Sequence, residues 1–548
     1  MEILQYFALN SRLSEELLKK NELKINDKSY SEWLNRTNDF RMNGYLMAQE
    51  LELKLASTQE NIIKIKGLDF PGIASQSSWE TKQLNSTYFD NRDFKLRELA
   101  IGLRIRKVED KIIQCVKSSG KAIGGLHQRN EDEIELDEPI LDTSKIEEPY
   151  LQILIEEAIE EGGEFIPCFE TIFERTDCIL TFSDGTKIEM ALDVGEIVNG
   201  NAKVDICEVE LELINGSADY VFAIGRYLIK ELDLVLANSS KARRGYSLCE
   251  RFNPKQKVMP VTELSQGIES EQAFEKICFN TLKHWQHYES FLSQDNAHGA
   301  VLEMYRAVMN LQHVYLVFGG LIPRTATNDL KRSWDWLAEA MRPIVDAAKH
   351  KRYLLAYLKL KADWDLVEEQ QNKIQVESAE MITQFKSLLK TQRYNLMMLN
   401  MSQWLYNKEW REVMSEDERE SLTTPIIEFA KKQLDHMLKE LKRDLGPKLD
   451  MAPKDYFKQI SHLRRALDTG LFFGSLFDSQ KRIGYRDVWV NIINNIRDLL
   501  RNEYISELQS KNHTQDEIDA WLNELNEPIL DELKYSRKLA FKLKGYWL

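Results

Sequence analysis

The chain has 548 residues, too many for a single ordinary hydrophobic core, and its length favours about three to four domain-sized units. Its hydrophobic content of 43% and charged content of 29% are those of globular proteins and exclude a disordered or collagen-like chain. The formal net charge of −15 argues against a protein that coats nucleic acid, because such binding needs clustered Lys and Arg. We therefore expect no nucleic-acid partner.

The cysteines and the apolar runs indicate the compartment. The six cysteines show no metal-ligand spacing and are too few for a disulfide framework, so we interpret them as reduced thiols. The longest apolar run, near residues 314–322, is far shorter than the ~20 residues that span a bilayer. The N-terminus also lacks the pattern of a secretion signal. These features predict a cytoplasmic protein with no membrane partner.

The hydrophobic pattern divides the chain into four parts. Residues 1–46 are polar and only briefly periodic, so we assign this N-terminal extension no defined structure. Residues 47–252 alternate with a period of two and contain turn signals such as Asp184-Gly185, which predicts antiparallel strands. Residues 253–265 carry two prolines and indicate a linker, whereas residues 266–548 show the period of helical bundles. We therefore expect an α+β multidomain protein.

Individual helices can be placed within this outline. In the strand-rich part, apolar residues return every three or four positions at 151–161 and 218–232, which predicts two helices. In the helical part, periods of 3.6 predict antiparallel bundles joined by short turns. The clearest of these periods cover residues 302–318, 330–348, 381–405, 425–445, 456–476, 489–508 and 517–543.

Several predicted strands alternate charged and apolar side chains. Glu50, Glu52 and Lys54 share one face of the first strand, and leucines occupy its other face. Arg104 and Arg106 form a similar row further along the chain. An antiparallel sheet with one face in water would explain any one such strand. The recurrence of these rows through the whole predicted sheet calls for a second explanation.

Rows of like charge are tolerated where groups of opposite sign lie between them. Divalent cations would neutralise a carboxylate row, and a polyanion would neutralise an arginine row. Closing the sheet into a barrel would place the rows face to face around a polar interior. Carboxylates that hold a metal, together with Arg and Lys that grip phosphate, favour hydrolysis of a phosphate chain without a covalent enzyme intermediate.

The charged strands carry a series of motifs, which in chain order are Glu50-x-Glu52-x-Lys54, Tyr88–Asp90, Leu103–Arg106, Lys117, Phe173–Arg175, Ala191–Gly195, Glu208-x-Glu210-x-Glu212 and Ser240–Tyr246. This series resembles the CYTH domain of the triphosphate tunnel metalloenzymes. The resemblance covers about residues 47–250 and is close to bacterial CYTH-CHAD inorganic triphosphatases. It implies a closed eight-stranded tunnel and hydrolysis of inorganic triphosphate to pyrophosphate and phosphate, with Mg²⁺, or Mn²⁺ in its place, as cofactor.

The resemblance implies a role for each of these charged residues. It makes Glu50, Glu52 and Lys54 the catalytic motif. It places the metal ions on carboxylates, namely Glu50, Glu52, Asp193, Glu208 and Glu210. It places the triphosphate on cationic side chains, namely Lys54, Arg104, Arg106, Lys117, Arg175 and Lys241.

Other residues share these faces without an assigned role. Glu133, Glu189 and Glu212 lie on the same predicted faces. Their roles stay open, because a row of three glutamates permits two registers for a two-glutamate motif. Arg244 is either a substrate ligand or a structural partner of a nearby acid, and we favour the second. His127 follows a glycine-rich turn, and we expect it in a surface loop rather than at the tunnel mouth.

The helical part resembles the CHAD domain, a family associated with polyphosphate binding. Ser461–Arg465 is similar to a basic CHAD motif, and the three-residue spacing puts His462 and Arg465 on one helix face. Nearer the N-terminus, Arg306, Asn310 and His313 stand where the family carries more cations. Polyphosphate binding is therefore one interpretation, and a structural or regulatory bundle is the one we favour slightly.

Two further functions stay open at this point. Thiamine triphosphate hydrolysis and adenylate cyclisation use related tunnels, so either could replace inorganic triphosphate hydrolysis. A protein of another class, which binds polyphosphate without turnover, would also need a sheet lined by cations. Turnover of triphosphate separates the enzymes from the binding protein.

Overall fold

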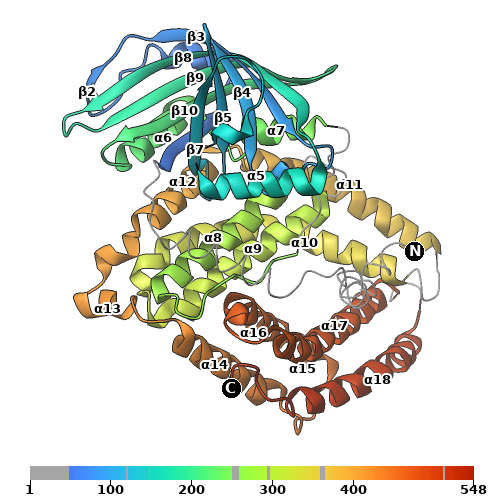
Figure 1. Cartoon of the computed structure of the whole chain (residues 1–548). Helices are drawn as coiled ribbons and strands as arrows, with labels where there is room; N and C mark the ends of the chain where they lie inside the picture. The colour runs from blue at the N-terminus through green and yellow to red at the C-terminus, as the bar shows by residue number, and fades with distance from the viewer. Residues whose placement is uncertain are drawn as a thin grey trace.

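A computed structural model describes residues 49–118, 121–146, 148–249, 258–292, 297–357, 364–509 and 513–548. The predicted N-terminal extension, and the first five residues of the predicted linker, lie outside these ranges. A sheet-rich half and a helical half lie one above the other (Figure 1). Among the described helices, none combines the length and hydropathy that crossing a membrane requires.

The sheet-rich half is built from eleven strands in one antiparallel sheet. Their alternating sequences form the strands, and glycines with positive φ at Gly185 and Gly200 turn the chain between the three longest. The strands are β1 (Gln49–Ala56), β2 (Ile73–Gln76), β3 (Glu80–Asp90), β4 (Gly102–Val108), β5 (Lys111–Lys117), β6 (Lys121–Ile123), β7 (Leu126–Leu136), β8 (Ile166–Phe182), β9 (Lys187–Asn199), β10 (Ala202–Asn215) and β11 (Val235–Leu236).

The sheet curls strongly, as the sequence predicts. Its hydrogen-bonded order is β11-β1-β10-β9-β8-β3-β4-β5-β7-β6, with β2 beside β8 and an additional pairing of β1 with β7. In Figure 1 the sheet has the outline of a half-barrel. The regular closed eight-stranded barrel is not confirmed, because the sheet has eleven strands and the β1–β7 pairing covers only Gln49–Leu53. Strands of unequal length account for the difference, since β8–β10 extend past their shorter neighbours.

Short helices pack around the sheet. The two helices predicted at 151–161 and 218–232 are confirmed as α5 and α6, and α6 packs against β1. Leu51, Leu53 and Leu55 of β1 are buried in the core on this outer side, so the opposite, charged face of β1 is the concave one. These helices are α3 (Gln59–Ile65), α4 (Lys95–Glu98), η1 (Thr143–Lys145), α5 (Pro149–Gly162), α6 (Asp219–Leu232) and α7 (Lys241–Ser247).

The helical half confirms the predicted bundle in outline. One expected helix, at residues 381–405, is two helices that meet at Thr391, whose side chain accepts a hydrogen bond from the Tyr394 N–H and caps the second. The helices are α8 (Ser270–Glu289), α9 (Ala297–Val317), η2 (Phe318–Gly320), α10 (Arg324–Tyr357), α11 (Trp364–Leu388), α12 (Gln392–Asn407), η3 (Glu409–Val413), α13 (Glu416–Ser421), α14 (Ile427–Leu445), α15 (Pro453–Phe457), α16 (Ile460–Phe473), η4 (Gly474–Leu476), α17 (Ser479–Gln509) and α18 (Gln515–Ala540).

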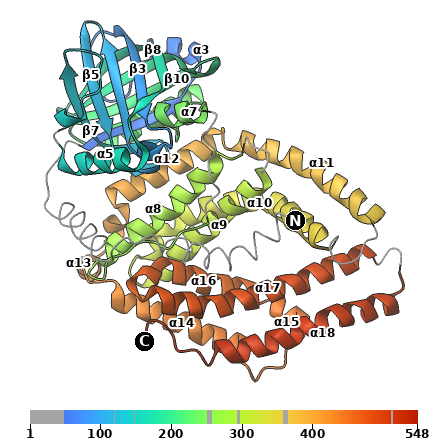
Figure 2. The ribbon, with the colours of Figure 1, turned by 45° about the vertical axis from the view of Figure 1, so that its right-hand side comes forward.

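The two halves share a hydrophobic core. One cluster of buried side chains runs from Leu53 of β1 through Phe222 of α6 to Trp285 of α8 and Leu399 of α12. In Figures 1 and 2 α12 lies directly against the sheet-rich half, and α18 lies at the far end of the molecule. The helices next to the sheet therefore belong to its packing as much as to the bundle.

Candidate functional site

Four neighbouring strands bring charged residues together on the concave face of the sheet. In the strand register, Lys54 of β1 lies opposite Glu210 of β10, and Glu208 lies opposite Asp193 of β9. Asp193 also lies opposite Arg175 of β8. Residues paired across neighbouring strands point to the same face, so the alternation of each sequence builds one charged surface.

Three buried carboxylates form the centre of this surface. Asp193, Glu208 and Glu210 each offer an oxygen within 4.8 Å of the others, and none is more than 7% exposed. The ammonium of Lys241, at the start of α7, lies among them. Its Nζ is 2.7 Å from Asp193 Oδ2 and 2.9 Å from Glu210 Oε1, and it also contacts Glu208. We name these three acids the carboxylate triad.

Two further cations hold the triad from either side. Lys54 Nζ lies 2.9 Å from Glu52 Oε2 and also contacts Glu210. The Arg175 guanidinium donates from Nε and Nη2 to the two oxygens of Asp193, each at 2.7 Å, and from Nη2 to Glu210 Oε2 at 2.5 Å. Such a bidentate contact fixes the carboxylate in position as well as neutralising it.

The charges of this centre depend on one another. Burial favours neutral Glu52, but the ammonium of Lys54 outweighs it and lowers the pKa of Glu52 to about 2. Burial likewise opposes ionisation of Asp193 and Glu210, yet Lys241 and other cations lower the pKa of both. Desolvation opposes the charge of Lys54, whereas Glu210 raises its pKa. All of these groups are therefore ionised at neutral pH.

A second charged group lies on β4, β5 and β7. Lys117 Nζ is 3.0 Å from Glu50 Oε2 and 2.9 Å from Glu131 Oε2. Arg104 approaches Glu131 Oε1 at 3.4 Å and donates to the Tyr88 hydroxyl at 3.1 Å. Burial would neutralise Glu131, but Lys117 and Arg104 hold its pKa well below the usual range. This group links the two ends of the curled sheet, since Lys117 reaches β1.

Arg106 is held more loosely than its neighbours. Its Nε donates to Ser86 Oγ at 3.5 Å, and its Nη1 lies 3.9 Å from Glu133 Oε1. Burial and the adjacent Arg104 lower the pKa of Arg106. Because its contact with Glu133 is as long as 3.9 Å, the charge of Arg106 is only weakly compensated, and an anion on the concave face would balance it.

The sequence missed one residue of this surface and misplaced another. Glu131 bridges Lys117 and Arg104, whereas Glu133, which the alternation singled out, is at the surface with 43% of its side chain exposed. His127 is fully buried in β7, not in a surface loop, and its Nε2 lies 3.2 Å from Ala237 O. The alternation of β7 marked the correct face but gave no register against β5, which pairs Lys117 with Glu131.

The remaining predicted residues lie at the edges of the surface. Arg244 contacts Glu208 and donates to Asp205 O at 3.2 Å, so it lies beside an acid as we favoured. Glu189 lies 3.9 Å from Arg175. Burial, with Glu50 next in effect, raises the pKa of Glu212 to about 7. No described contact under 4 Å joins Glu212 to a cation.

The helix that carries Lys241 is anchored at both ends. Ser240 caps its N-terminus by accepting from Arg243 N–H, and Tyr246 donates to the buried Asp90 at 2.9 Å. A Cβ at Gly245 would lie 2.1 Å from the ring of Phe169, so only glycine permits this close approach. The Ser240–Tyr246 motif thus serves to fix the ammonium over the triad.

The carboxylate triad fits a hard divalent cation. Its donors are three carboxylate oxygens, the ligand type that Mg²⁺ and Mn²⁺ prefer, and the Lys241 ammonium shows that positive charge is favoured there. A second group within 4.8 Å, Cys115 with Glu131 and Glu133, fits poorly, because burial raises the pKa of the Cys115 thiol to about 12. Among the described residues, Glu50 and Glu52 join neither group.

Five arginines form a second charged site in the helical half, where α9, α10, α16 and α17 meet. Three of them, Arg306, Arg464 and Arg486, attract the buried Asp468, whose pKa burial nevertheless raises to about 6. Burial and the neighbouring arginines lower the pKa of Arg497 to about 10. We name this set the arginine cluster; it comprises Arg306, Arg352, Arg464, Arg486 and Arg497.

Most of the residues that the sequence analysis singled out in the helical half lie outside the arginine cluster. His462 Nδ1 lies 2.9 Å from Asp444 Oδ2 of α14, and Arg465 lies near His313. Asn310 and His313 are buried, and burial lowers the pKa of His313 to about 3. Only Arg306 of the earlier trio reaches the arginine cluster. Arg352 belongs to α10, whereas Arg486 and Arg497 belong to α17, far away in the sequence, so no local motif marked them.

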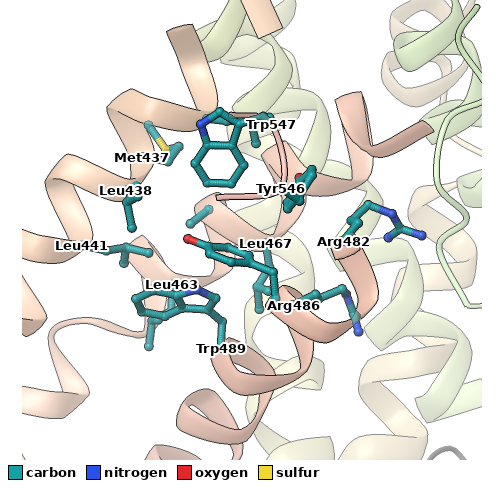
Figure 3. A pocket seen from close by; sticks show the side chains of 14 residues that line it. Met437, Leu438, Leu441, Leu463, Leu467, Arg482, Arg486, Trp489, Tyr546 and Trp547 are labelled. Carbon is teal, nitrogen blue, oxygen red and sulfur yellow. The ribbon is translucent and has the colours of Figure 1, made fainter. Parts of the chain in front are cut away.

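A small apolar cavity lies beside the arginine cluster. It has a volume of about 40 Å³ and is lined by α14, α16, α17 and the chain end, with Arg482 and Arg486 at one side (Figure 3). Leucine, methionine and aromatic side chains make up most of its lining, which suits an apolar group better than a phosphate chain. The charged surfaces are therefore the better candidate sites.

Comparisons with known proteins divide the chain in the same way. The family model of the CYTH domain matches residues 48–246, and that of the CHAD domain matches residues 276–500. An inorganic triphosphatase from Haemophilus influenzae is 32% identical over 206 residues, which are 37% of this chain and 56% of that protein. The chain thus matches about half the length of this curated relative.

Two solved structures are similar to the separate halves. A candidate adenylyl cyclase from Hippeastrum, described as having a dominant triphosphatase activity, is 20% identical with a TM-score of 0.28. It covers 36% of this chain and 95% of its own. The CHAD domain from Ricinus communis is 15% identical with a TM-score of 0.42, over 54% of this chain and 99% of its own. The chain therefore contains a CYTH-domain match, over residues 48–246, followed by a CHAD-domain match, over residues 276–500.

Proposed function

We propose that this chain hydrolyses inorganic triphosphate to pyrophosphate and phosphate on the concave face of its sheet, with Mg²⁺, or Mn²⁺ in its place. The observation that carries the proposal is the carboxylate triad, buried and surrounded by Lys54, Arg175 and Lys241. Burying so many charges costs free energy that their pairing only partly recovers, and binding of a charged ligand accounts for their position there. The inorganic triphosphatase of Haemophilus influenzae, 32% identical over 206 residues, supports the same substrate.

The residues of the site divide the work of hydrolysis. A bound divalent cation would neutralise phosphate charge and polarise phosphoryl oxygens. Asp193, Glu208 and Glu210 would hold it, with Glu50 and Glu52 nearby. The cations would turn from their present carboxylate partners to the triphosphate, with Arg104 and Arg106 at its far side. Water adds to the terminal phosphorus, the bridging P–O bond breaks, and pyrophosphate leaves with its charge held by these cations.

We also propose that the β1–β7 pairing closes the concave face into a tunnel. Lys117 of β5 bonds to Glu50 of β1, which supports closure, because the contact crosses between the two ends of the curl. A closed, water-poor interior strengthens each contact between phosphate and cation.

A substrate panel tests the proposal. The purified chain, at fixed Mg²⁺, is given inorganic triphosphate, ATP, thiamine triphosphate and long-chain polyphosphate, and released phosphate is measured. Fastest turnover of inorganic triphosphate is expected. Preference for thiamine triphosphate, or formation of cyclic AMP from ATP, would assign one of the related reactions. Absence of turnover with every substrate would overturn the proposal in favour of an anion-binding protein.

Two matched variants test the charged site, and a chelator tests the metal. Glu52→Gln keeps the shape of the side chain but removes its charge, so we expect phosphate release to fall at least about 100-fold with the circular dichroism spectrum unchanged. Glu196→Gln, at an exposed ion pair on β9, is the control and retains activity. EDTA should stop turnover in the wild-type chain; an unchanged rate in chelator contradicts the metal-dependent mechanism.

A second candidate function concerns the helical half. We propose that the arginine cluster binds polyphosphate, because it concentrates positive charge on a half that otherwise has little excess of either sign. Loss of both Arg464 and Arg497 to Ala should abolish binding of long-chain polyphosphate in calorimetric titration. Loss of Arg332, an exposed arginine of α10, is the control and leaves binding unchanged. Equal affinity in both proteins would contradict this assignment.

A further inference from the structure

The concave site is connected to the helical half through one residue, Asn238. Asn238 lies between β11 and the N-terminus of α7, two residues before the Ser240 cap. Its Oδ1 accepts a hydrogen bond from Gly125 N–H at 2.9 Å, in the turn between β6 and β7. It therefore joins the turn that precedes β7 to the helix that carries Lys241.

Lys54 is fixed by the same two segments. Its backbone N–H donates to Gly125 O at 2.9 Å, and its backbone C=O accepts from Ala237 N–H at 2.9 Å. Asn238 accepts a hydrogen bond from Gly125, and it directly follows Ala237 in the chain. Both ammonium groups that contact Glu210, those of Lys54 and Lys241, are thus attached to segments that meet at Asn238.

Two side chains of α8, in the helical half, form hydrogen bonds with Asn238. Gln286 Nε2 donates to Asn238 Oδ1 at 3.0 Å, and Asn238 Nδ2 donates to Glu289 Oε2 at 3.1 Å. Glu289 is itself held by the Tyr394 hydroxyl of α12, which donates to Oε1 at 3.2 Å. Trp285 Nε1 donates to that hydroxyl at 3.0 Å, so two helices fix the carboxylate.

Helix α12 holds the turn on its other side. Ser402 Oγ donates to Ile123 O at 2.9 Å, and Leu236 N–H donates to Asn395 Oδ1 at 2.9 Å. A Cβ at Gly124 would lie 2.4 Å from Ser402 Oγ and 2.8 Å from Met398 O. Only glycine lets the turn approach α12 so closely, and this closeness gives the network a single geometry.

We propose that Glu289 of the helical half, acting through Asn238, is a positioning residue that sets where Lys54 and Lys241 stand over the carboxylate triad. The expected effect on KM rests on the proposed function. The expected effect on the structure of β11 and α7 rests on the hydrogen bonds alone. A half-buried carboxylate that receives hydrogen bonds from both halves is a costly way to join two surfaces that apolar side chains already join. Its hydrogen bonds specify one arrangement of the two halves rather than strengthening the attraction between them.

The test compares four variants. Asn238→Ala and Glu289→Ala remove the network, and Glu289→Gln keeps its shape and one acceptor oxygen. Gln403→Ala is the matched control, because Gln403 of α12 receives a hydrogen bond from Arg226 of α6 at 2.6 Å, across the same interface but away from Asn238. Each protein is assayed for KM and kcat with triphosphate, and for hydrogen exchange in peptides that cover β11 and α7.

The expected result is specific to the network. Both alanine variants should raise KM about tenfold, since a small displacement of a charged clamp is costly, and should speed exchange in β11 and α7. Glu289→Gln should restore KM to within about twofold of the wild type. Gln403→Ala should alter neither measurement. If Glu289→Ala leaves both KM and exchange unchanged, or Gln403→Ala changes them equally, the inference is overturned.

The exchange measurement separates this inference from the proposed function. If the wild-type chain hydrolyses no triphosphate, the proposed function fails, yet faster exchange in β11 and α7 of the alanine variants still supports positioning. If triphosphate is hydrolysed and exchange stays the same in every variant, only the positioning role fails.

Discussion

Lys241 lies among three carboxylates, so removing its ammonium tests whether a cation is needed to balance their negative charge. Without the ammonium, Asp193, Glu208 and Glu210 would lose a buried countercharge, and Lys241→Met should lower the free energy of unfolding by roughly 3–5 kcal/mol in EDTA. Mg²⁺ binding to the same acids should recover part of this loss. Urea unfolding with and without Mg²⁺ measures both effects.

The control for Lys241 is a lysine on the same sheet. Lys203 forms an exposed pair with Glu196 at 3.2 Å, and Lys203→Met should change stability by less than about 1 kcal/mol. A loss in Lys241→Met that Mg²⁺ leaves untouched would show that the triad does not hold the ion.

Asp468 gives a prediction on pH. Burial raises the pKa of its carboxyl to about 6 in the folded state, against 3.8 for the ordinary group, so the folded state holds the proton more tightly. The contribution of Asp468 to stability is therefore full below about pH 4 and is lost as pH rises towards 6. Asp468→Asn should be more stable than the wild type at pH 7 by roughly 2–3 kcal/mol, and equal to it near pH 3.5. Thermal unfolding at the two pH values measures the difference; an equal difference at both would contradict it.

At the residue scale, the sequence indicated which faces carry charge but not which charges meet. Alternation alone places Glu50, Glu52 and Lys54 on one side of β1, and the structure buries that side. It could not distinguish Glu131 from Glu133, because both lie on the same face and only the pairing with β5 decides which one reaches Lys117. The arginine cluster could not be predicted from the sequence either, since its members come together only when four helices pack.

Two helical glycines give opposite predictions at the scale of elements. Gly484 of α17 is exposed, and a Cβ there would meet no atom within 4 Å, so Gly484→Ala should add about 1 kcal/mol through helix propensity. Gly225 of α6 faces β1, and its Cβ would lie 2.3 Å from Leu53 Cδ2 in the buried core. Gly225→Ala should lower stability by roughly 1–3 kcal/mol through overpacking. Chemical unfolding of both variants checks the signs; stabilisation by Gly225→Ala would show that α6 can move away from the sheet.

Element types followed from periodicity, whereas their ends depended on local capping. The period at 330–348 lies inside α10, and the period at 302–318 ends one residue past α9. Both helices begin before their periods because helix ends need no apolar face. The break between α11 and α12 falls in a continuous period at 381–405. It is set by the Thr391 cap, a signal that a single threonine in a sequence gives only weakly.

At the scale of the whole molecule, the boundary between families is not a boundary in the core. The sequence placed a linker at 253–265 and thereby suggested two independent domains. The structure joins Leu53 of β1, Trp285 of α8 and Leu399 of α12 in one buried cluster. A second cluster, around Leu533 of α18 and Ile496 of α17, holds the far end of the helical half. Chain connectivity is visible in a sequence, but the packing of α8 and α12 under the sheet is not.

The division of the core predicts how the protein unfolds. Leu53→Ala should open a cavity in the first cluster and cost about 2–5 kcal/mol, so α8 and α12 should lose hydrogen-exchange protection together with β1. Leu533→Ala is the matched control in the second cluster, and it should weaken α17 and α18 while the sheet keeps its protection. Exchange measured by mass spectrometry at increasing urea distinguishes the two patterns. If α8 and α12 stay protected when Leu53→Ala opens the sheet, the helical half unfolds as its own unit. The hydrogen bonds through Asn238 would then join two separately stable bodies rather than parts of one.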